Sequence, residues 1–83
     1  MKIADNISWK KLQDKVVAVN LTTGTYYTMN SLASEIWTLL ADIRTPAEIA
    51  DIITTEYDAT PEIILADLNS QIDYWKKEGL ITE

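Results

Sequence analysis

The chain has 83 residues, of which 47% are hydrophobic, and this composition predicts one small folded domain spanning residues 1–83 rather than a disordered tail. It contains no cysteine and no histidine, which excludes disulfide bonds, thiolate chemistry and the commonest general base. The formal net charge is −6 with only seven basic residues, so we expect no nucleic-acid partner, because duplex binding depends on Lys and Arg that neutralise phosphates.

The sequence shows no targeting or membrane-spanning segment. Its first residues, Met1–Asp5, lack the apolar run of a signal peptide. The uncharged stretch from Val16 to Ser34 contains polar residues throughout, so it is unsuited to span a bilayer. We therefore expect a cytoplasmic protein with no membrane partner.

The first third of the chain is predicted to be extended. Ile7–Leu12 is a weak strand candidate, whereas the β-branched residues of Lys15–Leu21 give the strongest strand signal in the sequence. Thr22–Gly24 is typical of a hairpin loop, with glycine supplying a positive φ. Thr25–Met29 is then expected to return as an antiparallel strand, which completes a three-stranded sheet.

The expected third strand, Thr25–Met29, has the composition of an unprotected sheet edge. Strand alternation places Tyr27 and Met29 on the core face, with Tyr26 and Thr28 on the other. The segment contains no charged residue and no proline, which are the residues that usually block an exposed edge. Such a strand is either paired on both sides within the sheet or receives a partner strand, and the residues alone leave both readings open.

The rest of the chain carries strong helix signals. Asn30 or Ser31 is expected to cap a first helix, and Thr45–Glu48 combines a capping box with proline at the first helical position. Thr60–Glu62 repeats the cap and proline at the start of a third helix, which Gly79 ends in a left-handed conformation. These signals predict an α+β fold that is winged-helix-like, with a three-stranded antiparallel sheet followed by three helices that cover one of its faces.

The third helix presents two neighbouring stripes of side chains. The stripe expected to face the core consists of Leu65, Leu68, Ile72 and Trp75. The adjacent stripe, expected to line a groove beside the open strand, consists of Ile64, Asp67, Gln71 and Tyr74. Solvation alone is an alternative for Asp67, and a position at the core edge is an alternative for Tyr74. Trp37 and Trp75 are expected in the core, and the position of Trp9 is left open because the first strand is weakly patterned.

The acidic residues do not suggest an active site. Glu48 is explained by the capping box, and Glu62 by its position near a helix N-terminus. No carboxylate pair is expected to share one environment, and a solvated surface is expected for Asp5, Asp14, Asp42, Asp51, Asp58, Asp73, Glu78 and Glu83. The sequence contains no calcium-binding loop and no glycine-rich loop. We therefore predict a protein that is not an enzyme and uses no metal or cofactor.

The segment from Val17 to Asn30 resembles the strand–glycine–strand–Asn segment of PqqD-like proteins. The likeness continues through Ala33, Ile36, Trp37 and Leu40, through residues 44–49 at the start of the second helix, and through Tyr57-Asp58 to the closing Glu78-Gly79-Leu80-Ile81. It covers about residues 12–82, and the ordered series of segments is more specific than any one of them.

This resemblance implies a recognition element for ribosomally made precursor peptides. In such proteins the leader segment of the precursor adds as a strand beside the third strand and lies in a groove closed by the third helix. The resemblance implies a free-standing protein, similar to those of lasso-peptide pathways, that presents the leader to a leader peptidase and a modifying enzyme such as a cyclase. The expected peptide-binding residues are Thr25, Tyr26, Tyr27, Thr28, Met29, Ile64, Asp67, Leu68, Gln71 and Tyr74.

Three alternatives follow from the same residues. A winged-helix nucleic-acid-binding protein shares the fold class, but the net charge argues against it. A small enzyme would have to assemble its nucleophile and base from lysines and carboxylates alone. A PqqD-type chaperone of a quinone-cofactor pathway would carry an arginine- and proline-rich opening segment, which this sequence lacks.

Overall fold

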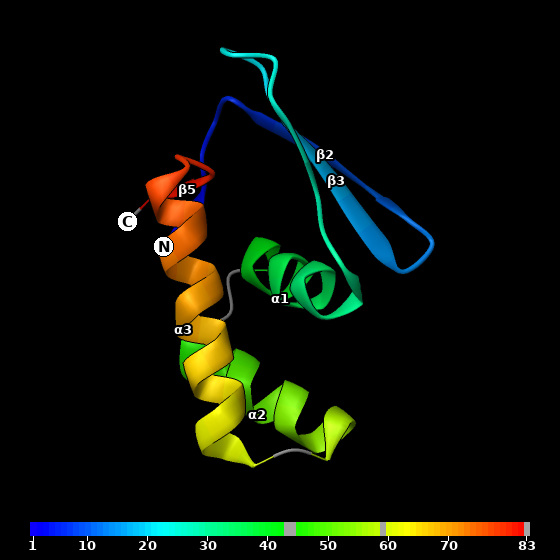
Figure 1. Ribbon diagram of the computed structural model, residues 1–83, viewed down its shortest axis with the longest axis vertical. Coiled ribbons are helices and arrows are strands. Elements are labelled where there is room, and N and C mark those ends of the chain that lie inside the picture. The colour runs from blue at the N-terminus through cyan, green and yellow to red at the C-terminus, as the bar shows by residue number, and fades with distance from the viewer. Residues whose placement is uncertain (43–44, 59, 83) are drawn as a thin grey trace.

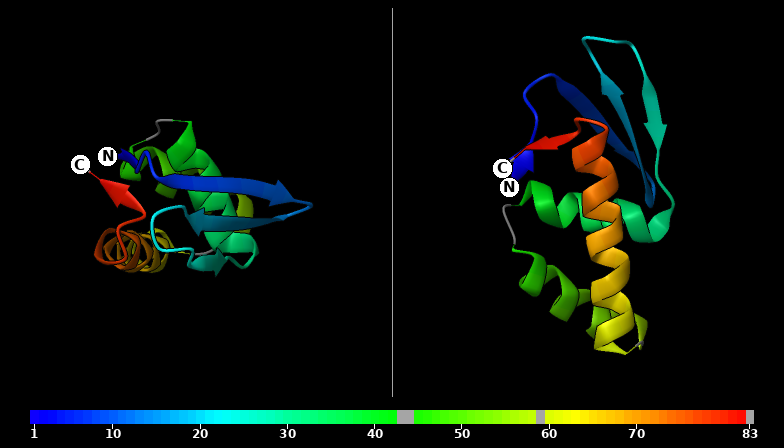
Figure 2. Two further views of the ribbon diagram at one scale, coloured as in Figure 1. Left: turned by 90° about the horizontal axis from the view of Figure 1, so that it is seen from above. Right: turned by 60° about the vertical axis from the view of Figure 1, so that its left-hand side comes forward.

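The computed structural model describes residues 1–42, 45–58 and 60–82. A three-stranded antiparallel sheet is followed by three helices, which confirms the predicted element order and the α+β class. The sheet has the strand order β2-β3-β4, and the elements are β2 (Ile7–Leu12), β3 (Lys15–Asn20), β4 (Tyr26–Thr28), α1 (Ser31–Ala41), α2 (Pro46–Tyr57) and α3 (Pro61–Lys77). The β2–β3 hairpin projects beyond the helices, and α3 crosses α1 (Figures 1 and 2). Among the residues described, no helix is long and apolar enough to cross a membrane.

A second, two-stranded ladder joins the ends of the chain and was not predicted. β1 (Lys2–Ile3) pairs antiparallel with β5 (Ile81–Thr82), and the Ala4 amide donates to the Leu80 carbonyl at 3.0 Å. Figure 1 shows the two termini side by side near the end of α3. Two-residue strands are too short to show an alternation of apolar and polar residues, so the sequence contains no periodic signal that predicts them.

The β3–β4 connection is shaped by a side chain as well as by glycine. Asn20 Oδ1 accepts hydrogen bonds from the amides of Thr22 and Thr23 at 2.9 and 3.2 Å. Gly24 follows with φ +79°, a conformation that costs glycine little. Strand β3 ends at Asn20, one residue earlier than predicted, although the Leu21 amide still bonds the Asn6 carbonyl at 2.8 Å, in register with the β2–β3 ladder.

The helix ends follow the local signals in the sequence. Asn30 Oδ1 caps α1 by accepting from the Ala33 amide at 2.8 Å, and Thr45 and Glu48 form the predicted capping box at α2. Thr60 is the N-cap of α3 but makes no side-chain capping bond, so Pro61 is the stronger start signal there. At the other end of α3, Gly79 has φ +78°, and the Leu80 amide bonds the Trp75 carbonyl at 2.8 Å, as in a Schellman motif.

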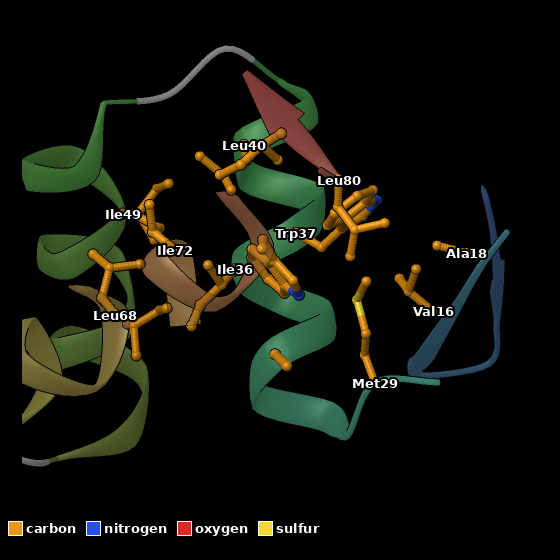
Figure 3. Close-up of a cluster of buried hydrophobic side chains, with 14 of the residues drawn as sticks. Val16, Ala18, Met29, Ile36, Trp37, Leu40, Ile49, Leu68, Ile72 and Leu80 are labelled. Carbon is orange, nitrogen blue, oxygen red and sulfur yellow. The ribbon is translucent and has the colours of Figure 1, made fainter. Parts of the chain in front are cut away.

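Trp37 stands at the centre of the hydrophobic core. It is fully buried and meets Trp75 edge to face, with ring centroids 5.1 Å apart. Figure 3 shows Trp37 between the side chains of the helices and those of the sheet. The predictions for Trp37 and Trp75 are confirmed. Trp9 also meets Trp37 edge to face, with ring centroids 6.3 Å apart, but it remains 37% exposed, so it covers the core rather than filling it.

The predicted core stripe of α3 was wrong at its first position. Ile64 is buried, whereas Leu65 is 43% exposed. Both residues lie one turn before Leu68, at the i−4 and i−3 positions, so helical spacing alone does not separate them. The contact between α2 and α3 selects the side that is covered, and that choice is a tertiary one.

Candidate functional site

A groove of about 640 Å³ runs between β4 and α3, with the start of α1 as its floor. We refer to it as the β4–α3 groove. Strand β4 leads directly into α1, while α3 crosses α1 on the same side (Figure 2). The lining residues are Tyr26, Tyr27, Thr28, Met29, Asn30, Leu32, Ala33, Ile36, Asp67, Ser70, Gln71, Tyr74 and Trp75.

Strand β4 forms one wall, and its outer backbone edge has no strand partner among the described residues. The Thr25 carbonyl and the Met29 amide both bond to β3, at 2.9 and 3.0 Å. Backbone groups alternate along a strand, so the amides and carbonyls of Tyr26 and Thr28 point away from β3. This edge therefore offers two amides and two carbonyls to another extended chain.

The side chains of β4 divide between core and surface as the sequence predicts. Met29 is buried and Tyr27 is half-buried, whereas Tyr26 is 72% exposed. The Tyr27 hydroxyl donates to Glu78 Oε1 at 3.3 Å, which connects β4 to the residue that ends α3. Desolvation, followed by the negative charge of Glu78, raises the pKa of Tyr27 above its ordinary value.

One face of α3 forms the opposite wall. Asp67, Gln71 and Tyr74 line the groove, at the i, i+4 and i+7 spacing that the sequence predicts for one helix face. Two other residues expected at the site lie elsewhere: Ile64 and Leu68 are buried in the core and do not line the groove. Ser70 and Trp75 line the groove instead, and both lie three or four residues from other groove residues of α3, so they share its groove face.

The floor of the groove was missed by the sequence analysis. Leu32, Ala33 and Ile36 of α1 line it, although their spacing indicated only a core-facing stripe. Leu32 remains half-buried, because the groove leaves it uncovered on one side. Thr25, expected at the site, lies just outside the lining, where its carbonyl is committed to β3. No sequence signal distinguishes a groove floor from ordinary core.

The groove has an acidic character. Asp67 is the single charged residue among those that line it, and Glu78 lies at the end that Tyr27 bridges. The net charge of −6 adds a long-range field of the same sign. The site therefore favours an extended peptide that is neutral or positively charged.

A second hollow, of about 310 Å³, lies between α1 and α2 and corrects an expectation about the carboxylates. Glu35 of α1 faces Glu56 and Tyr57 of α2 across it. Desolvation raises the pKa of Glu35, and the neighbouring Glu56 carboxyl acts in the same direction. A carboxylate pair thus does share one environment, which the sequence could not reveal because the two residues are 21 positions apart.

Comparison with known proteins agrees with this arrangement. Residues 15–81 match the family model described as coenzyme PQQ synthesis protein D (PqqD). The chain is 34% identical to TbiB1, solved in complex with the TbiA(beta) leader peptide, over 96% of this chain and 93% of that one, with a TM-score of 0.94.

The fold also matches lasso peptide synthetase B1, solved in complex with the leader peptide. The identity is 23%, the coverage is 99% of this chain and 96% of that chain, and the TM-score is 0.91. Among curated proteins, none matches the chain. The family match extends over most of the chain and includes β3, β4, the groove and all three helices, whereas β2 lies before it. The chain therefore belongs to the PqqD family.

Proposed function

We propose that this protein binds the leader segment of a ribosomally made precursor peptide in the β4–α3 groove. The observation that carries the proposal is the free edge of β4, where the outward amides and carbonyls of Tyr26 and Thr28 border the groove. An extended peptide would add as a fourth strand there, with main-chain hydrogen bonds supplying affinity and the groove selecting side chains. The likeness to TbiB1, which was solved with a leader peptide, supports this choice of ligand.

The protein acts as an adaptor in this proposal, and not as an enzyme. Holding the leader raises the effective concentration of the precursor at a leader peptidase and at a modifying enzyme, without new chemistry in the adaptor itself. The sequence resemblance to the recognition proteins of lasso-peptide pathways supports a pathway of that kind for this protein. The quinone-cofactor pathway is the second candidate, because the matching family model is described by that pathway.

Isothermal titration with two synthetic leaders tests the proposal. One is the leader of the precursor encoded beside this protein, and the other comes from a precursor of the quinone-cofactor pathway. We expect saturable binding of the first and weaker binding of the second, and the reverse order would assign the protein to the quinone pathway. Absence of binding to both would refute leader recognition.

Proline at position 28 tests the binding mode. Thr28→Pro removes an outward amide of β4 and should abolish binding while preserving helical circular dichroism. The matched control is Lys11→Pro, which removes an outward amide at the opposite edge of the sheet. The Val16 carbonyl accepts from the Met29 amide, just after β4, so the backbone groups of the next residue, Val17, point towards β2. Val17 is paired with Lys10, so the backbone amide of Lys10 points towards β3 and that of Lys11 points outward. Binding by the Thr28 variant at normal affinity would place the peptide elsewhere.

A further inference from the structure

The domain consists of two halves that meet along the β4–α3 groove. One half is the sheet with α1, which is tied to β3 where the Val16 amide donates to Ser34 Oγ at 2.7 Å. The other half is the α2–α3 pair, in which Ile53 of α2 and Leu68 of α3 are both fully buried. The groove takes its strand wall and its floor from the first half and its helix wall from the second. The separation of the two halves therefore sets the width of the groove.

The two halves are fastened together near the C-terminal end of α3. There β1 pairs with β5, the Ala4 amide donates to the Leu80 carbonyl at 3.0 Å, and the Tyr27 hydroxyl donates to Glu78. Figure 1 shows both termini at this end, with α2 beside the other end of α3. The contact between α1 and α2 is much smaller than that between α2 and α3. The α1–α2 contact is therefore the place where the separation of the halves can adjust.

A pair of carboxylates lies at this contact. The hollow of about 310 Å³ between α1 and α2 is lined by Glu35 of α1 and by Glu56 in the last turn of α2. Glu35 Oε2 is shielded from solvent and has no hydrogen-bond partner among the described residues. Glu35 lies within one turn of the floor residues Leu32 and Ile36. Two carboxylates that share a site repel each other when both are ionised, and one proton removes that repulsion.

The other titratable groups around the hollow leave this pair poised to take up a proton. Desolvation, followed by the Glu56 carboxyl, raises the pKa of Glu35, and Tyr57 of α2 and Lys11 of β2 offset only part of this effect. Asp14, in the turn after β2, also borders the hollow, but its hydrogen bond from the Ser31 hydroxyl lowers its pKa. Asp14 therefore remains ionised in the range where Glu35 titrates.

From this arrangement, and on the basis of the proposed function, we infer that the Glu35–Glu56 pair is a proton-dependent spacer between α1 and α2 that couples leader binding to the uptake of a proton. A leader that contacts both the floor and the helix wall would draw α3, and α2 with it, toward α1. Glu56 would then approach Glu35, which favours the protonated form of the pair. Linkage is reciprocal, so protonation should strengthen leader binding by the same factor. The leader affinity should therefore rise as pH falls through the range in which the pair titrates.

Calorimetric titration in two buffers of different ionisation enthalpy tests the inference, because it counts the protons taken up on binding. The probe is the synthetic leader of the precursor encoded beside this protein. The wild type should take up part of a proton and bind at least about threefold more tightly at the acid end of the range, since one linked proton changes affinity by at most about tenfold per pH unit. Glu35→Gln should lose this uptake and this pH dependence, apart from what the leader itself contributes.

Glu62→Gln is the matched control. Glu62 is an exposed carboxylate in the first turn of α3, outside both the groove and the hollow. This variant should keep the proton uptake of the wild type. A second measurement needs no variant: carbon-13 NMR of the Glu35 carboxyl should show a higher pKa when the leader is bound than when it is absent.

The outcomes separate this inference from the proposed function. If the wild type binds no leader, the proposed function fails, and the inference fails with it. If the wild type binds the leader with the same proton uptake as Glu35→Gln, only the spacer inference fails. An equal loss of uptake in Glu62→Gln, or a Glu35 pKa that the bound leader lowers or leaves unchanged, would also overturn it.

Discussion

The hydroxyl of Tyr27 on β4 donates to Glu78 at the end of α3, across an oxygen–oxygen distance of 3.3 Å. These residues are 51 positions apart, and their contact joins the two walls of the groove at one end. The wall to which a peptide strand would add is thereby held at a defined distance from the helix that would cover it. Preorganisation of this kind reduces the conformational entropy that binding would otherwise cost.

Tyr27→Phe should weaken leader binding more than it weakens the fold. The bond is exposed, so its loss should barely change the unfolding midpoint, whereas the freed walls should lower the leader affinity. Glu78→Gln keeps an acceptor oxygen and should largely retain affinity. It should also lower the Tyr27 pKa, because the negative charge of Glu78 is one of its causes, although desolvation still holds that pKa above its ordinary value. Titration calorimetry measures the leader affinity, and tyrosine-resolved NMR titration measures the Tyr27 pKa. Equal leader affinities of the wild type, Tyr27→Phe and Glu78→Gln would exclude the preorganising role.

Glu35→Gln should stabilise the protein near neutral pH and not in acid. Desolvation and Glu56 raise the folded-state pKa of Glu35, while Tyr57 and Lys11 oppose them, and Asp14 also borders this hollow. Between the unfolded and folded pKa values the folded state binds more protons, so stability falls as pH rises through that window. Glutamine removes this penalty, so its advantage should be present above the window and vanish below the unfolded pKa. Thermal unfolding from pH 4 to 8 measures this, with Asp73→Asn as the exposed control, and a pH-independent difference would refute it.

The fold was predictable wherever a short stretch of sequence determines it. The capping box at Thr45, the proline at position 61 and the glycine at position 79 are local signals, and each marks a helix end in the structure. The edge at Thr25–Met29 also follows from local composition and strand order. These features depend on neighbours within about one helical turn or one hairpin, where periodicity and turn chemistry are informative.

The remaining features depend on contacts between distant segments. Ile64 replaces Leu65 in the core because of where α2 lies, and Leu32 lines the groove because α3 crosses α1. The Glu35–Glu56 pair and the β1–β5 ladder likewise join residues that are far apart in sequence. The three groove residues of α3 predicted correctly in position, Asp67, Gln71 and Tyr74, lie where the helical period alone sufficed.

Trp37→Ala should unfold the domain or nearly so. The side chain is fully buried and packs against both Trp9 and Trp75. Replacing such an aromatic with alanine costs about 3–5 kcal/mol, a large share of the stability of a small domain. Trp9→Ala is the matched comparison, because Trp9 packs on the same ring but is 37% exposed, and it should cost less. Urea denaturation followed by circular dichroism measures both, and a well-folded Trp37 variant would contradict its central place in the core.

Asp67→Asn should weaken binding of a leader that carries a basic residue opposite it, without a change in stability. Asp67 is the single carboxylate that lines the groove, and it is exposed, so the fold does not depend on its charge. Asp73→Asn removes the same charge from an exposed position of α3 outside the groove, so it reports the long-range field alone. If Asp67 contacts the leader directly, the Asp67 variant should lose more leader affinity than the Asp73 variant does. This difference in affinity should persist at high salt, whereas the loss that both variants share should shrink, because salt screens distant charges most. Titration calorimetry at low and high ionic strength separates the two, and equal losses in both variants would assign Asp67 to general attraction rather than to recognition.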